Sequence, residues 1–149
     1  VNIDYPTLQE EKKIMRAHIN NSFPHTTPVI DTNKIVKARE LVKQVYIDER
    51  IEQYVADIVF ATRYPEQYKL NDLKDYISFG GSPRASINLA LAARACAFIK
   101  RRGYVVPEDV REVAADVLRH RIGLSYEAEA ANIKADDIVA KILNKVEVP

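Results

Sequence analysis

The sequence of 149 residues lacks three features that would point to particular classes of protein. No apolar run approaches the roughly 20 residues that cross a membrane, so we expect neither a membrane segment nor a membrane partner. The net charge is only +1, without the strongly basic stretch typical of nucleic-acid-binding domains, so we do not expect nucleic acid as a partner. Cys96 is the single cysteine, which excludes an internal disulfide and favours a reducing, cytoplasmic location.

The motifs of several catalytic and metal sites are missing as well. A P-loop ends in Gly-Lys followed by Ser or Thr, and no Gly-Lys pair occurs in the sequence. His18, His25 and His120 do not have the spacing of zinc ligands. Asp48 follows a short apolar run, as in a magnesium-binding strand, but the run comes directly after a helical pattern, so Asp48 is better explained as a helix N-cap. We therefore expect neither a metal site nor a catalytic residue in this chain.

The sequence that is present has the periodicity of helices. A chain of this length is one domain by default and can bury a core. Apolar residues at helical spacing, with prolines and capping residues between them, predict an all-α bundle of about five or six helices. One of these capping signals is the spacing of Thr7 and Glu10, which is that of a capping box. The expected helices cover about Thr7–Ile19, Asn33–Val45, Asp48–Tyr64, Pro83–Arg102, Pro107–Arg119 and Ala135–Lys145. Residues 20–32 and 66–79 are expected to be loops, the second with one helical turn, and residues 104–106 could pair with 121–126 as a minimal β ribbon.

The start of the fourth helix is the most informative stretch. Gly80 and Gly81 give the backbone conformational freedom, Ser82 can cap the helix with its hydroxyl, and Pro83 suits the first helical position. Arg84 then falls in the first turn, where the helix dipole is already positive and a cation is unfavourable. A bound anion would remove this conflict, because free N–H groups and a guanidinium together form a phosphate site. On the spacing alone, an arginine that points into water is the simpler explanation.

Two further basic clusters lie at helix ends. Lys100–Arg102 follows the Ala-rich helix that contains Cys96, which is apolar nearly all round and is therefore expected to be buried on all sides by its neighbours. Gly103 is expected to end that helix. Arg119–Arg121 ends the next helix. Cations at a helix C-terminus are favourable for the dipole, so each cluster can be a solvated helix end. For Arg119–Arg121 an interface or phosphate-binding role is an equal alternative.

An ordered set of short motifs resembles a known family. The stretches that carry the resemblance are Ile3–Pro6, Ala61–Arg63, Gly80–Ser86, Arg102–Val110, Val117–Arg121 and Leu124–Glu129. In this order they resemble the C-terminal lid domain of the MoxR family of AAA+ ATPases, which are related to the magnesium-chelatase ATPase subunits. The resemblance extends over nearly the whole chain. Gly81 stands where many relatives have Ala, and the 64–79 segment is longer than its commonest form.

The resemblance implies a function. Residues 1–149 would form a lid that closes over ATP and Mg²⁺ held by a larger α/β core, and Arg84 would be the sensor-2 arginine that reaches the γ-phosphate. The P-loop, the magnesium-binding strand and the arginine finger would precede Val1, so the fragment alone would not hydrolyse ATP. Members of the family act as chaperone-like, ring-forming ATPases, often with a partner that carries a metal-binding adhesion-type domain. The implied motion is a swing of the lid about Gly80-Gly81 and the stub at residues 1–5.

Two alternatives come from other classes of protein. One is a helix-turn-helix DNA-binding domain, with the 107–119 helix in the groove and Lys100–Arg102 on phosphates, although the near-neutral charge argues against it. The other is a free-standing helical adaptor for partner proteins. The adaptor requires a start codon near Val1 and no ATPase core before it.

Overall fold

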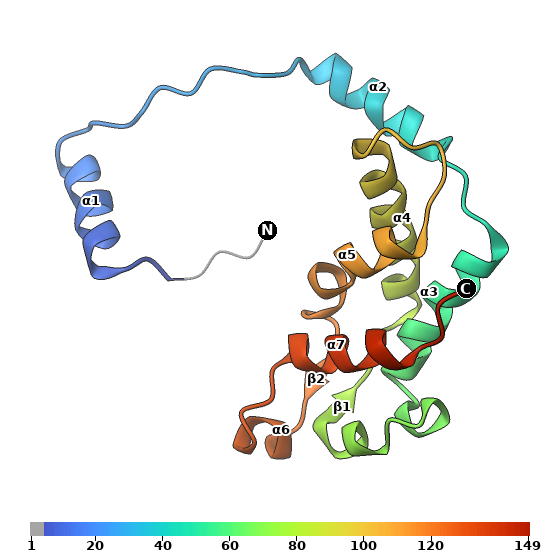
Figure 1. Cartoon of the computed structure of the whole chain (residues 1–149). Coiled ribbons are helices and arrows are strands. Elements are labelled where there is room, and N and C mark those ends of the chain that lie inside the picture. Colours follow the sequence, from blue (N-terminus) through green and yellow to red (C-terminus); the bar gives the residue numbers. More distant parts are fainter. Residues whose placement is uncertain (1–4) are drawn as a thin grey trace. The chain divides into compact units, whose positions relative to one another are not determined.

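The computed structural model describes residues 5–149 and divides into two compact units, one ending at Ala38 and the other covering Arg39–Pro149 (Figure 1). The division falls within α2 (Thr32–Lys43). The expected stub and the first residues of the Ile3–Pro6 motif lie outside the described part, apart from Tyr5 and Pro6. Each unit is described by itself below.

The first unit holds a helix that buries no side chain. The helix α1 (Leu8–Ile19) begins at Thr7 with the expected capping box, in which the Thr7 hydroxyl accepts from the Glu10 backbone N–H and the Glu10 carboxylate accepts from the Thr7 N–H at 2.8 Å. Its apolar residues are exposed, including Ile14 and Met15. The segment from Asn21 to Asp31 contains no helix or strand, so the prediction of a long loop is confirmed.

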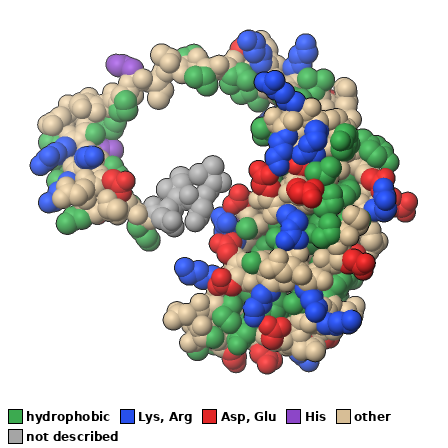
Figure 2. Space-filling model, in the orientation of Figure 1, with side chains coloured by type: hydrophobic (Ala, Val, Ile, Leu, Met, Phe, Trp, Pro, Cys, Tyr) green, Lys and Arg blue, Asp and Glu red, His purple; other side chains and the backbone are tan. Residues whose placement is uncertain are grey.

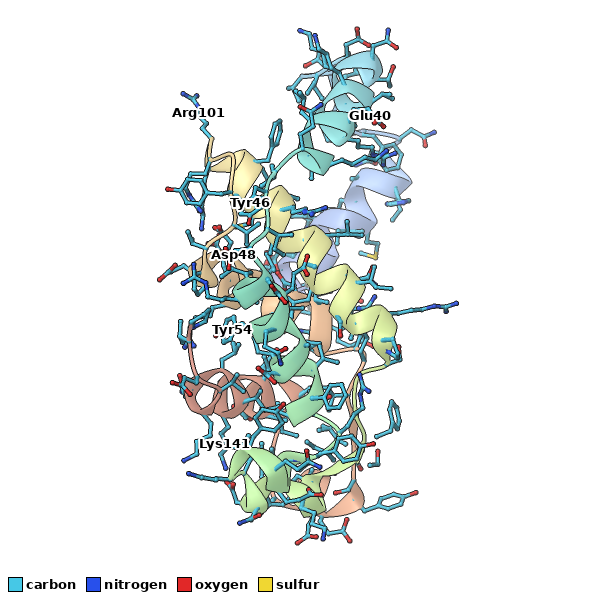
Figure 3. The ribbon with its side chains drawn as sticks, turned by 90° about the vertical axis from the view of Figure 1, so that its right-hand side faces the viewer. Glu40, Tyr46, Asp48, Tyr54, Arg101 and Lys141 are labelled. Atoms are coloured by element: carbon cyan, nitrogen blue, oxygen red, sulfur yellow. The ribbon has the colours of Figure 1, made fainter. Side chains whose placement is uncertain are left out.

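The second unit is a helical bundle built around α4. Its helices are α3 (Glu49–Ala61), α4 (Pro83–Ile99), α5 (Pro107–Leu118), α6 (Tyr126–Ala130) and α7 (Ala135–Lys145). Asp48 caps α3 as expected, since its carboxylate accepts from the Arg50 N–H at 3.0 Å. Tyr54 and Ile58 of α3, with Leu89 of α4, are among the fully buried core residues, and Figure 3 shows Tyr54 within the bundle.

The segment between α3 and α4 is more ordered than the sequence suggests. It forms two short 3₁₀ helices, η1 (Pro65–Tyr68) and η2 (Asn71–Tyr76), and the strand β1 (Ile77–Phe79). Leu70 and Leu73 anchor it in the core. The strand β1 pairs antiparallel with β2 (Gly123–Leu124), so the fold is all-α with a minimal ribbon, as expected.

The predicted partner in that ribbon was wrong. Tyr104 instead forms a parallel bridge with Tyr46, in which the Val105 N–H donates to the Tyr46 carbonyl at 3.0 Å and the Tyr46 N–H donates to the Gly103 carbonyl at 2.9 Å. This bridge ties the residues before α3 to the α4–α5 connection. Figure 3 shows Tyr46 beside this connection, with Arg101 extending away from it.

The helix α4 differs from its prediction in two ways. It is not buried all round, because Ile87 (58%), Leu91 (50%) and Ile99 (78%) retain large exposed fractions. It also ends before Gly103: Arg101 adopts the left-handed conformation (φ 58°), and the Arg102 N–H donates to the Ala97 carbonyl at 2.9 Å. Arg101 thus has the role that the sequence assigns to glycine. Within residues 5–149, no helix combines the length and hydropathy needed to cross a membrane.

Candidate functional site

Arg84 lies exposed in the first turn of α4, as the sequence predicts. Ser82 occupies the N-cap with an extended backbone (φ −73°, ψ 171°), but its side chain makes no capping hydrogen bond, so that detail of the prediction was wrong. The first turn contains no acidic residue. Within the part of the chain that the structure describes, the Arg84 guanidinium has no hydrogen bond and no carboxylate partner. Within the described residues, the anion-binding group at this helix start is therefore the unpaired guanidinium itself, because Pro83 has no N–H and the Ala85 N–H donates to the Ser82 carbonyl at 2.7 Å.

The two residues that follow α3 hold the loop before Arg84. The buried Thr62 hydroxyl donates to the Val59 carbonyl at 2.6 Å and accepts from the Gly81 N–H at 2.8 Å. Arg63 donates from Nε to the Gly81 carbonyl at 2.7 Å. Both backbone groups of Gly81 are therefore bound by consecutive residues of one neighbouring segment. We call this arrangement of Thr62, Arg63 and Gly81 the α3 clamp.

The glycines here serve close packing rather than flexibility. No glycine in the described residues has a positive φ. A Cβ at Gly80 would lie 2.5 Å from the Thr62 carbonyl oxygen, and one at Gly81 would lie 3.0 Å from the Ala85 Cβ. These contacts favour a packing role over the predicted hinge at Gly80-Gly81, because the loop is bonded to the residues after α3 and has no space for a side chain at Gly80.

The opposite end of α4 is a closed ion-pair network. Asp109, which is fully buried at the start of α5, accepts from both terminal nitrogens of Arg102 at 2.7 and 2.5 Å and from Lys100 Nζ at 3.2 Å. It also accepts from the Val106 N–H at 3.1 Å, and Lys100 pairs in addition with Glu112. Burial raises the pKa of Asp109, but these hydrogen bonds outweigh it and lower that pKa to about 2. Lys100 and Arg102 therefore have internal partners and are not available to bind a phosphate backbone.

The basic cluster at the end of α5 is also engaged. Arg119 pairs with Asp116 at 2.9 Å and with Asp136 at 3.0 Å. Arg121 donates to the Val117 carbonyl at 2.6 Å and contacts His120. These bonds join α5 to its own last turn and to α7, which favours the structural explanation over a phosphate-binding one.

The distribution of charge on the surface also argues against a phosphate-binding role for the basic clusters. Figure 2 shows basic and acidic side chains interspersed over the face in view, without an extended region of one sign. The helix α5, which a DNA-binding domain would place in the groove, carries Glu108, Glu112 and Asp116. Carboxylates along a reading helix would repel the phosphates of a nucleic acid, so the geometry disfavours the DNA-binding alternative.

Sequence reasoning found Arg84 but gave no role to Thr62, Arg63 or Asp109. Thr62 and Arg63 lie in a motif that contributes to the resemblance, yet their partner Gly81 is far along the chain. Asp109 stands three residues after Val106, at the position of a capping box, and this spacing could have indicated its bond to the Val106 N–H.

Comparison with known proteins gives a consistent picture. Residues 71–142 match the AAA lid domain family. The chain is 37% identical, over all its 149 residues, to Chaperone MoxR1 of Mycobacterium tuberculosis, of which it covers 39%, and 35% identical over 147 residues to the protein YeaC of Bacillus subtilis, of which it covers 43%. Protein MoxR of Paracoccus denitrificans is 43% identical over 79 residues, which are 50% of this chain and 23% of that protein.

A solved structure shares the fold as well. A crystal structure from Cytophaga hutchinsonii, of a protein named as a presumed ATPase, superposes with a TM-score of 0.82 and 40% identity over the whole of this chain and 46% of that one. The chain thus spans about two fifths of the length of the first two relatives and less than half of the solved neighbour.

Proposed function

Because the chain belongs to the MoxR family of AAA+ ATPases and contains their lid domain, we propose that Arg84 contacts the γ-phosphate of ATP held by a core domain outside this sequence. The observation that carries the proposal is the unpaired, exposed guanidinium at the start of α4. A γ-phosphate would provide the negative charge that neither the first turn nor the surroundings of Arg84 provide. In this proposal all of residues 1–149 act as the lid.

The remainder of the nucleotide site would come from the core domain. The residues of this chain offer no P-loop, so ATP and Mg²⁺ would be bound mainly by that domain, and the fragment alone would be inactive. Arg84 would stabilise charge on the terminal phosphate during its transfer, which is the main contribution that a protein makes to such reactions.

The helices next to Arg84 would respond to the nucleotide together. With a γ-phosphate bound, its charge favours the arrangement in which Arg84 contacts it, and loss of that phosphate removes the attraction. Since the α3 clamp binds the loop before Arg84, the arginine would move together with α3 and α4 rather than by bending at Gly80-Gly81. Any swing would therefore occur outside this loop.

The wider role follows from the relatives. One of them is named as a chaperone, and we propose that the complete protein forms a ring in the cytoplasm and remodels partner proteins as it hydrolyses ATP. A partner with a metal-binding adhesion-type domain fits this role.

The test is Arg84→Ala in the complete protein. We expect ATP turnover to fall by about 100- to 1,000-fold, because removal of one preorganised charge-stabilising donor costs about 2.7–4 kcal/mol. The unfolding midpoint should not change, since Arg84 has no partner in the described residues. The matched control is Arg101→Gln at the other end of α4, also an exposed arginine, which should leave turnover unchanged. Unchanged turnover and nucleotide affinity in Arg84→Ala would refute the proposal.

A further inference from the structure

The α3 clamp lies directly before the arginine on which the proposed function depends. Gly81 precedes the N-cap Ser82, and Arg84 follows in the first turn of α4. The direction of a helix, and with it the direction of its first side chains, is set by the residues that enter it. The clamp fixes one of these residues through both its N–H and its carbonyl group.

Each half of the clamp is itself held in place. Thr62 is fully buried, and its hydroxyl cannot rotate away without breaking the bond it donates to the Val59 carbonyl. The guanidinium of Arg63 lies over the Phe60 ring, with Cζ 4.7 Å from the ring centroid. This cation–π contact restricts the orientation of the guanidinium, and with it the position of Nε. Both anchors come directly after α3: Thr62 is its C-cap, and Arg63 is the next residue.

The fit leaves little room for adjustment. The Gly80 Cα lies so close to α3 that a Cβ there would be 2.5 Å from the Thr62 carbonyl oxygen and 2.7 Å from its hydroxyl oxygen. Only three residues, Gly80 to Ser82, connect β1 to α4. A change at the end of α3 must therefore be transmitted to the first turn of α4, because the short connection cannot absorb it.

We infer that Thr62 and Arg63 are positioning residues for Arg84, and that they couple the end of α3 to its contact with the γ-phosphate. The inference rests on the proposed function of Arg84. Neither residue is required to touch the nucleotide, since their bonds end on Gly81. Their effect on the reaction passes through the place that they give to the Arg84 guanidinium.

The inference is tested by a double-mutant cycle in the complete protein. Thr62→Val keeps the side-chain shape but removes both hydroxyl bonds, and Thr62→Ser keeps the hydroxyl as a rescue variant. We expect Thr62→Val to lower ATP turnover at least about tenfold, since a misplacement of about 1 Å can cost about 100-fold. In an Arg84→Ala background the same substitution should cost no further turnover.

The readouts separate positioning from a purely structural role. Thr62→Val should weaken ATP binding while leaving ADP binding unchanged, because ADP lacks the phosphate that Arg84 contacts. Thermal unfolding, measured alongside, shows how much stability each variant loses. A structural role alone would lower turnover by the same factor in both backgrounds and affect ADP as much as ATP.

A second variant keeps the test decisive if Thr62→Val does not fold. Arg63 is only half-buried, and Arg63→Lys keeps its charge but loses the Nε bond to Gly81. We expect Arg63→Lys to lower ATP turnover as Thr62→Val does, and to cause no further loss of turnover in the Arg84→Ala background. If each substitution lowered turnover by the same factor in both backgrounds, the inference would be overturned and the proposed function would stand. If Arg84→Ala itself changed neither turnover nor nucleotide affinity, both would be overturned.

Discussion

The two ends of α4 hold their cations in opposite ways. At the C-terminal end, Lys100 and Arg102 share the buried carboxylate of Asp109, so both of these cations have a partner within the fold, while Arg101 between them is exposed. At the N-terminal end, Arg84 is exposed and has no such partner in the described residues, although its position next to the positive end of the helix dipole is the less favourable one.

The comparison shows which basic cluster is structural. Sequence alone gives both ends an arginine beside a helix terminus, and the C-terminal cluster has the larger charge. The structure points to the N-terminal end as the binding site, because a cation with an internal partner stabilises the fold, whereas one without a partner can bind a ligand. The N-terminal end is instead held by the bonds of Thr62 and Arg63 to the Gly81 backbone, and neither bond involves the Arg84 guanidinium.

The largest effect should come from removing the shared carboxylate. Asp109→Ala leaves two cations and the Val106 N–H without their acceptor, and breaking a buried ion pair in this way costs about 3–5 kcal/mol of unfolding free energy. Denaturant unfolding measures the loss. The control is Glu112→Ala, which removes a carboxylate that is 57% exposed from the same Lys100 and should cost less than about 1 kcal/mol. Equal losses in the two variants would contradict the assignment of Asp109 as the centre of the network.

A matched pair of glycines tests how the two ends are packed. Gly80→Ala places a methyl group against the Thr62 backbone and should cost about 1–3 kcal/mol, as overpacking usually does. Gly103→Ala, at the other end, meets no atom within 4 Å and has no positive φ, so it should be neutral or add about 0.4–1 kcal/mol by restricting the unfolded chain.

The two glycine variants are compared by thermal and denaturant unfolding of the same protein. If Gly80→Ala proved as well tolerated as Gly103→Ala, the loop before α4 would have the slack that a hinge requires. The contrast between a packed N-terminal end and an open C-terminal connection would then fail.

The smallest effect is a pH dependence at the C-terminal end. Because the pKa of Asp109 is lower in the folded protein (about 2) than in the unfolded chain (3.8), its contribution is complete above about pH 5 and is lost as pH falls. From pH 6 to pH 3 we expect a loss of about 1 kcal/mol from this carboxylate. Arg102→Gln removes its closest donors and should reduce that loss. An identical acid dependence in the two proteins would show that Asp109 is not its source.

The main helices could be predicted because their signals are local. The capping box at Thr7 and Glu10, the N-cap at Asp48 and the apolar spacing of α3 each lie within one or two turns of chain, and the structure reproduces them. The ribbon partner of residues 121–126 was missed because β1 has three residues, too few for a period to be read. The five-residue α6 was missed for the same reason.

The prediction that α4 is buried on all sides was the main error that came from reading its composition. Ile87, Leu91 and Ile99 are apolar, and a helix rich in such residues reads as buried on all sides. Sequence cannot distinguish an apolar side chain that meets the core from one that is left exposed, because that depends on which neighbouring helices cover the face.

The site was predictable only in part. Arg84 was identifiable because its conflict with the helix dipole is visible within four residues. The α3 clamp was not identifiable, because it joins Arg63 to Gly81 across two 3₁₀ helices and a strand. No local sequence pattern indicates that these two residues come together in space. The structure also explains why the two glycines are needed, which the sequence attributes to flexibility.

The parallel bridge between Tyr46 and Tyr104 has a consequence for the order of folding. The α4–α5 hairpin joins neighbours in sequence and can form early, whereas this bridge must close a loop that contains α3, α4 and everything between them. We expect the bridge to form late, so that strand-like protection of the Tyr46 and Val105 amides from hydrogen exchange marks the final step of assembly.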